Sequence, residues 1–127
     1  MYRETTDGIL VEVNPSYLRE HSDPAQGLFV FAYEVTISNE SRQPARIVAR
    51  HWVIRDGDGG EREVEGEGVV GEQPHLLPGA SFTYSSYCPL ATPTGSMRGT
   101  YRMVRDDGTE FDAKIPLFFL RDLAHYQ

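Results

Sequence analysis

A glycine-rich segment is the part of the chain whose residue types come closest to a ligand-binding motif. Gly66, Gly68 and Gly71 match the pattern G-x-G-x-x-G, which in dinucleotide-binding folds brings backbone N–H groups to a pyrophosphate at a helix N-terminus. Two prolines follow soon afterwards and no helical periodicity appears, so the pattern favours a strand or loop whose backbone packs closely or bulges at a sheet edge. Binding of a nucleotide, pyrophosphate or metal–phosphate complex is the alternative, through Gly66, Gly68, Gly71, Gln73 and His75.

An acidic cluster raises the hypothesis of a divalent cation site, because Mg²⁺ and Ca²⁺ prefer hard oxygen ligands. Two aspartates and Glu67 fit positions of a calcium-binding EF-hand loop, but Glu61 stands where the obligatory glycine belongs. Glu61, Glu63 and Glu65 also alternate, which on a strand places them on one solvated face that discourages pairing between sheets. We therefore expect no metal site and no cofactor.

The histidines and the cysteine form no catalytic pattern. The spacings of His21, His51, His75 and His125 match no zinc signature. Cys88 is the only cysteine and has no neighbouring histidine or cation in sequence to lower its pKa, so it is expected to be a small core residue. With no G-x-S-x-G elbow either, the sequence predicts a protein that is not an enzyme.

Aromatic residues gather in residues 81–90 and near the end of the chain. The alternation of apolar and polar residues predicts that most of these aromatic residues lie in the core, but it does not place Tyr87 and Phe118 there. His51 lies on the strand face opposite Trp52, which predicts a partly exposed side chain. His51, Tyr87 and Phe118 are therefore the predicted interaction surface, and a patch of this type is typical of contact with a protein partner.

The elements that would position these residues are strands, because apolar and polar residues alternate along much of the chain. This alternation forms apolar stripes, each on one face of an expected strand, over residues 9–13, 29–37, 47–54, 82–84, 101–103 and 111–119. In the third stripe Val48, Trp52 and Ile54 share one parity. The last stripe places Leu117 and Phe119 on the same face as Ala113, Ile115 and Phe111.

Turn residues separate these stripes, and Asp107-Gly108 predicts a two-residue hairpin. About seven short strands with a tryptophan in the third predict an all-β fold, an immunoglobulin-like or fibronectin type III-like antiparallel β-sandwich. An up-and-down barrel is the structural alternative. We expect one domain over residues 1–127, because no repeat or linker divides the chain.

Charge and composition limit the classes of partner. The net charge is -7 and the chain contains a single lysine, with arginines scattered among acidic residues, so nucleic acid is not expected to bind. No signal peptide or membrane-length apolar run is present, and the lone cysteine suits a reducing compartment. We expect a cytoplasmic protein without membrane insertion, as a monomer or weak homodimer.

Residues 31–33, 50–52, 65–74, 77–79, 92–101 and 115–118 form a set of motifs that is specific when taken together. On these segments the chain resembles the ApaG family over most of its length. The resemblance implies a fibronectin type III-like or immunoglobulin-like sandwich. It also implies an association of bacterial members with cobalt resistance and magnesium efflux, and a protein-binding role like that expected of the related domains in F-box proteins and in a polymerase delta-interacting protein. In the family the glycine motif has been discussed as a pyrophosphate-binding element, and no catalytic residue is implied.

Two functions follow as hypotheses. The first is a binding module that recognises a protein, in connection with divalent-cation homeostasis, through a sheet face or the loop of residues 66–79. The second is the binding of a phosphate-containing small molecule at the glycine segment, residues 66–71.

Overall fold

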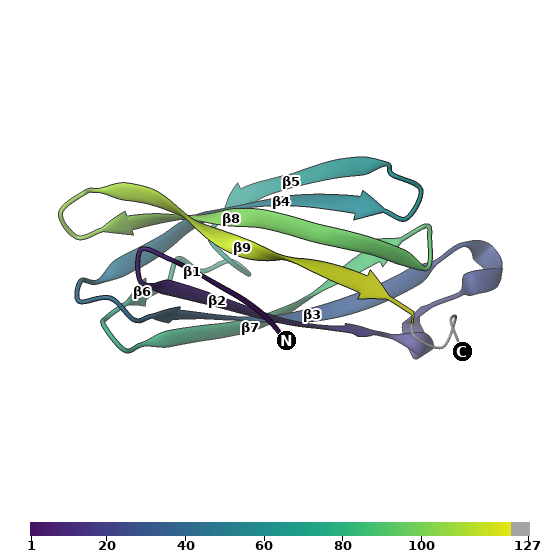
Figure 1. Cartoon of the computed structure of the whole chain (residues 1–127), viewed down its shortest axis with the longest axis horizontal. Helices are drawn as coiled ribbons and strands as arrows, with labels where there is room; N and C mark the ends of the chain where they lie inside the picture. Colours follow the sequence, from purple (N-terminus) through teal and green to yellow (C-terminus); the bar gives the residue numbers. More distant parts are fainter. Residues whose placement is uncertain (123–127) are drawn as a thin grey trace.

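The computed structural model describes residues 1–122, which form two antiparallel β-sheets packed face to face (Figure 1). One sheet has the strand order β1-β2-β3-β7 and the other β5-β4-β8-β9, with the short β6 also paired to β4. The strands are β1 (Tyr2–Thr6), β2 (Ile9–Tyr17), β3 (Phe29–Asn39), β4 (Ala45–Asp56), β5 (Glu61–Glu67), β6 (His75–Leu76), β7 (Ser81–Leu90), β8 (Thr94–Arg105) and β9 (Glu110–Arg121), and the 3₁₀ turns are η1 (Arg19–His21) and η2 (Pro24–Gln26). The predicted antiparallel sandwich is confirmed, with nine strands in residues 1–122 rather than about seven.

The core lies between the two sheets and is centred on Trp52. The inward residues of β2 and β3 are buried as their alternation predicts. The Trp52 ring centroid lies 5.3 Å from that of Tyr33 on the facing sheet and 5.9 Å from that of Phe118. One aromatic cluster therefore joins both sheets, as expected of a packed sandwich interior.

The two long sides of the sandwich differ. On one side β1 approaches β9: the Lys114 N–H donates to Thr6 Oγ1 at 3.1 Å, and the rings of Tyr2 and Phe118 lie 6.1 Å apart. On the other side β5 and β7 are the edge strands of their respective sheets and do not pair with each other (Figure 1). The sandwich is therefore closed along β1 and β9 and open along β5 and β7.

A β-bulge at Val48 reverses which residues of β4 face the core. Ile47 pairs with Met103 and Ala49 with Arg102, so β4 contains one residue more than β8 in this interval. Ile47 is buried before the bulge, and Trp52 after it. The predicted face that combined Val48 with Trp52 is therefore wrong at Val48, because the extra residue shifts the alternation.

A second irregularity corrects the prediction for the end of the chain. Between the pairs Gly99↔Ile115 and Met97↔Phe118, β9 contains one residue more than β8. Phe118 is consequently buried, with 0% exposure, and cannot belong to an interaction surface. Leu117 and Phe119, predicted to face the core, are 48% and 43% exposed.

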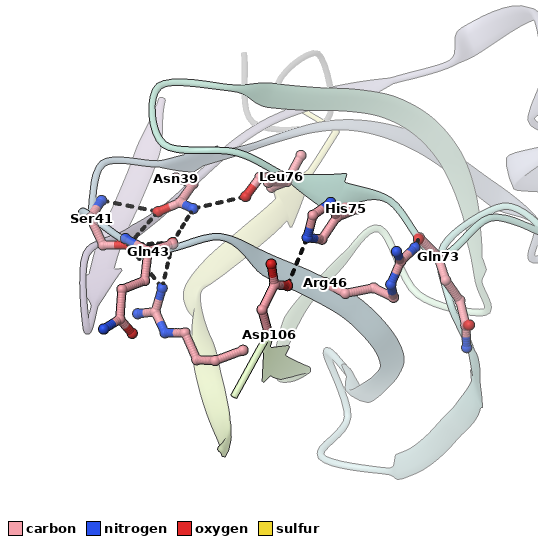
Figure 2. Close-up of polar contacts among 9 residues, drawn as sticks. Asn39, Ser41, Gln43, Arg46, Gln73, His75, Leu76 and Asp106 are labelled. Carbon is pink, nitrogen blue, oxygen red and sulfur yellow. Dashed lines mark hydrogen bonds and ion pairs between the residues drawn. The ribbon is translucent and has the colours of Figure 1, made fainter. Parts of the chain in front are cut away.

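Connections between strands are tied by side chains as well as by backbone. The hairpin at Asp107-Gly108 is present, but its strands end at Arg105 and Glu110, so the connection has four residues and not two. At the corner after β3, the buried Asn39 side chain donates to the carbonyls of Gln43, at 2.8 Å, and Leu76, at 2.9 Å (Figure 2). These bonds join the β3–β4 connection to β6.

No helix in the described part of the chain has the length and apolar character that crossing a membrane would require.

The bulge in β9 predicts that two adjacent phenylalanines contribute very unequally to the free energy of unfolding. We expect Phe118→Ala to lower the free energy of unfolding by about 3 to 4 kcal/mol, because it removes a buried ring from the core. Phe119→Ala should change it by less than about 0.5 kcal/mol, because that ring lies on the outer face. Urea denaturation followed by circular dichroism measures both, and equal losses in the two variants would contradict the observed register.

Candidate functional site

The glycine-rich segment forms a tight turn between β5 and β6. The Val69 N–H donates to the Glu72 carbonyl at 2.8 Å, and the Glu72 N–H donates to the Val69 carbonyl at 2.9 Å. The two residues between them, Val70 and Gly71, have φ values of +42° and +81°. This is the backbone geometry of a type I′ turn. The next regular element is β6 and not a helix, so the segment lacks the helix N-terminus of a dinucleotide-binding loop.

Close packing explains the other two glycines of the motif. At Gly68, which has a φ of +61°, a Cβ atom would lie 2.1 Å from the Glu72 carbonyl oxygen. At Gly66 it would lie 2.7 Å from the guanidinium carbon of Arg50. The predicted role of these glycines in close backbone packing at a sheet edge agrees with this geometry.

Hydrogen bonds anchor the segment to the bulge of β4. The carbonyl of Val48 accepts the Gly68 N–H at 2.8 Å and the Gln73 side-chain amide at 3.0 Å. Arg50 donates to the carbonyls of Glu67, at 3.0 Å, and Gly68, at 3.2 Å. The N–H groups of Gly68, Val69 and Glu72 and the amide of Gln73 are thus already engaged within the protein.

The two predicted histidines lie on different strands, His51 on β4 and His75 on β6. His75 is on β6 opposite Arg46, and its Nε2 lies 2.8 Å from Asp106 Oδ1 (Figure 2). His51 lies opposite Glu65, and its Nε2 is 2.8 Å from Glu63 Oε1. Of the five predicted ligand residues, the structure groups Gly66, Gly68, Gly71 and Gln73 at one turn and places His75 on the following strand.

The acidic residues of β5 lie on an exposed edge strand, as their alternation predicts. Glu61 lies 3.4 Å from Arg98, and Glu63 pairs with His51. Among residues 1–122, no group of three or more His, Cys, Asp and Glu side chains is arranged to hold a metal ion.

Buried titratable groups of the core are held in their protonated forms. Burial raises the pKa of the Cys88 thiol, and the nearby Arg62 guanidinium opposes this shift only in part. Burial also raises the pKa of Tyr84 and Tyr101, whose hydroxyls hydrogen-bond to each other in the core. A protonated and buried thiol is a poor nucleophile.

The predicted interaction residues do not form one surface. Tyr87 on β7 is 66% exposed, and the partly buried His51 belongs to the other sheet. With Phe118 buried, only Tyr87 keeps its predicted place as an exposed aromatic residue. Arg50 was not predicted as a site residue from the sequence. It lies on the same strand face as the core residues Trp52 and Ile54, and an arginine on a face that is predicted to be buried is the signal that would have identified it.

The comparisons with known proteins agree with one another. A protein-family model described as the ApaG domain matches residues 19–105. Protein ApaG from Anaeromyxobacter dehalogenans (strain 2CP-C) is 53% identical over 118 residues, which is 93% of each chain. Protein ApaG from Pseudomonas aeruginosa (strain LESB58) is 53% identical over 117 residues, covering 92% of this chain and 93% of the relative. A crystal structure of a Bordetella pertussis protein described as ApaA superposes with a TM-score of 0.87, at 48% identity and 94% coverage of both chains.

The predicted resemblance is confirmed by this agreement of sequence and structure over almost the whole chain. The chain belongs to the ApaG family.

Proposed function

We propose that this chain is a non-enzymatic, cytoplasmic binding module that takes an extended segment of a partner protein onto the free edge of β7. The observation that carries the proposal is the contrast between the two edge strands of the open side. β5 has the sequence EREVEGE, with four glutamates and one arginine, whereas the ten residues of β7, SFTYSSYCPL, include no charged residue. Natural sheet edges are protected by charged side chains, by proline or by covering elements. β7 has no charge, and its one proline, Pro89, lies next to the end of the strand at Leu90.

The backbone of β7 presents hydrogen-bonding groups to the open side. Pro89 pairs with Val30, whose carbonyl turns away from β7 to accept the Leu18 N–H at 2.8 Å. Pro89 therefore turns its own carbonyl outward, where Arg62 donates to it at 2.7 Å. Since backbone groups alternate along an antiparallel strand, Ser85 and Tyr87 also direct their N–H and C=O groups to the free edge.

The side chains of β7 leave this edge accessible. Ser81, Thr83 and Ser85 are small and exposed. The Thr83 hydroxyl forms a hydrogen bond of 2.9 Å with the hydroxyl of Thr36 on β3, and the Ser81 hydroxyl forms one of 2.8 Å with that of Ser38 on the same strand. These hydroxyls are turned toward the sheet rather than across the edge, so an incoming strand meets backbone groups first.

A partner strand added to such an edge gains affinity from main-chain hydrogen bonds and specificity from alternate side chains. The occupant we propose is an extended segment of a different protein. A second copy of this chain, paired β7 to β7, is the competing occupant and would appear as a dimer in sedimentation. The association of ApaG proteins with cobalt resistance and magnesium efflux is proposed to act through the partner protein.

A proline in β7 tests this proposal. Ser85→Pro removes an N–H that faces the free edge and leaves the ladder to β3 intact, because proline is tolerated where its nitrogen faces solvent. We expect the partner captured from native cytosol to bind this variant at least about tenfold more weakly. In the purified complex, hydrogen exchange should show new protection at Ser85 and Tyr87.

Ser85→Ala is the matched control, because it removes the same hydroxyl and keeps the N–H. It should bind the partner as the wild type does. Undiminished binding by Ser85→Pro, or protection confined to the other sheet, would overturn the proposal.

The glycine segment generates a separate prediction about stability. Gly68→Ala should lower the free energy of unfolding by at least about 2 kcal/mol, because its Cβ would meet a backbone carbonyl. Gly71→Ala, in the same turn and with open space around it, should lose only about 1 kcal/mol from its positive φ. Thermal unfolding measures both.

The same assay examines the phosphate-binding alternative. A ligand that binds the folded state raises the melting temperature. An increase produced by millimolar pyrophosphate in the wild type and lost in Gly71→Ala would contradict a purely structural role for the turn.

A further inference from the structure

The open side of the sandwich contains a pocket of about 370 Å³ between β5 and β7. Its inner wall includes the buried Tyr33, Trp52 and Tyr84, and its mouth is formed by residues from both edges. This volume falls in the range of small-molecule sites, which are mostly apolar with a few convergent polar groups. The wall is aromatic, so the pocket suits a flat or branched apolar group.

Two arginines supply positive charge to this pocket. Arg50 lies opposite the fully buried Tyr101 in the β4–β8 pairing, so it is on the core face of β4. Arg62 reaches across from β5 and donates to the Pro89 carbonyl at 2.7 Å. Both line the pocket, and within residues 1–122 neither forms an ion pair with a carboxylate. Both donate to backbone carbonyls, which leaves their charge unneutralised, so in a chain with a net charge of -7 this is a local positive site.

The charge of Arg50 reaches the inner wall of the pocket. Burial raises the pKa of Tyr33, Tyr84 and Tyr101, and the Arg50 guanidinium partly opposes the shift at all three. An arginine without a carboxylate partner beside an aromatic wall can donate two parallel hydrogen bonds to a carboxylate.

The mouth of the pocket holds exposed apolar side chains, one of them on a strained backbone. Val64, Val70 and Tyr87 are 40%, 57% and 66% exposed and all line the pocket. Val70 has a φ of +42°, which is unfavourable for a β-branched residue. It occupies a turn position where asparagine or glycine is usual. Since Val70 gains little burial in return, and strain of this kind clusters at ligand sites, its side chain is suited to contact a bound molecule.

We propose that this pocket binds a small carboxylic acid with an aromatic or branched aliphatic body. The body lies against Trp52 and Tyr33, and the carboxylate is bound by Arg62, with the positive charge of Arg50 on the same pocket wall. This inference goes beyond the proposed protein-binding function. The two sites share Tyr87 and Pro89 of β7, but Ser85, on which the protein-binding function is tested, does not line the pocket, so the two proposals are tested separately.

Trp52 provides a reporter inside the site, because it is the only tryptophan of the chain. Hydrocinnamate is the probe, hydrocinnamyl alcohol supplies the same body without charge, and acetate supplies the charge without the body. We expect hydrocinnamate to produce a saturable change in tryptophan fluorescence, the alcohol to bind about tenfold more weakly, and acetate to have no effect. Calorimetry gives the same affinities independently of the optical signal.

Arg62→Gln tests the positive charge at an exposed position that tolerates substitution. It should weaken hydrocinnamate binding about tenfold, to the level of the alcohol, and leave the alcohol unchanged. Arg98→Gln is the matched control, since Arg98 also lies next to β5 but does not line the pocket. Ser85→Pro should bind hydrocinnamate as the wild type does.

Three results would overturn the proposal: no saturable response to hydrocinnamate up to about 10 mM, equal affinity for the acid and the alcohol, or wild-type affinity in Arg62→Gln. Val70→Gly adds a second measurement that does not depend on charge. It should raise the melting temperature by relieving strain and weaken binding of both the acid and the alcohol.

Discussion

The extra residue at Val48 in β4 is the constraint on which the arrangement of the open side depends. By interrupting the pairing with β8 it leaves the Val48 carbonyl free to accept the Gly68 N–H and the Gln73 amide. It also shifts the alternation of β4, so that Trp52 faces the core and Arg50 shares that face. A single bulge thus fixes the glycine turn outside the sheet and an arginine at its inner side.

This connection gives the glycine motif a structural cause. Arg50 lies where a side chain at Gly66 would stand, and it also holds the carbonyls of Glu67 and Gly68. In a dinucleotide-binding loop, glycines let a phosphate approach free N–H groups. In this chain glycines of the same spacing let a guanidinium and a carbonyl approach, and the N–H groups bond within the protein. The same sequence pattern therefore meets a different steric need.

Alternation predicted the sandwich well because the side-chain period of a strand is two wherever pairing is regular. It failed at the bulges, where one extra residue exchanges inside and outside: Phe118 is buried and Phe119 exposed as a result. Pro116, next to the shift, was an available signal, because proline within a strand pattern marks an edge or a bulge. The position of Arg50 could be predicted from its parity with Trp52. The pocket that it lines lies between β5 and β7 on the open side of the sandwich, and the spacing of residues in the sequence does not reveal which edge strands share that side.

The strain at Val70 shows how the turn and the pocket are related. A type I′ turn with valine at its first central position is costly by itself, by an amount on the order of 1 to 3 kcal/mol. The backbone bonds between Val69 and Glu72 and the anchor at Val48 hold it in place. Glycine at position 70 would relieve the strain without disturbing those bonds, because they involve neighbouring residues. What only the side chain of Val70 supplies is an apolar contact at the pocket mouth, so the backbone cost is best accounted for by what binds there.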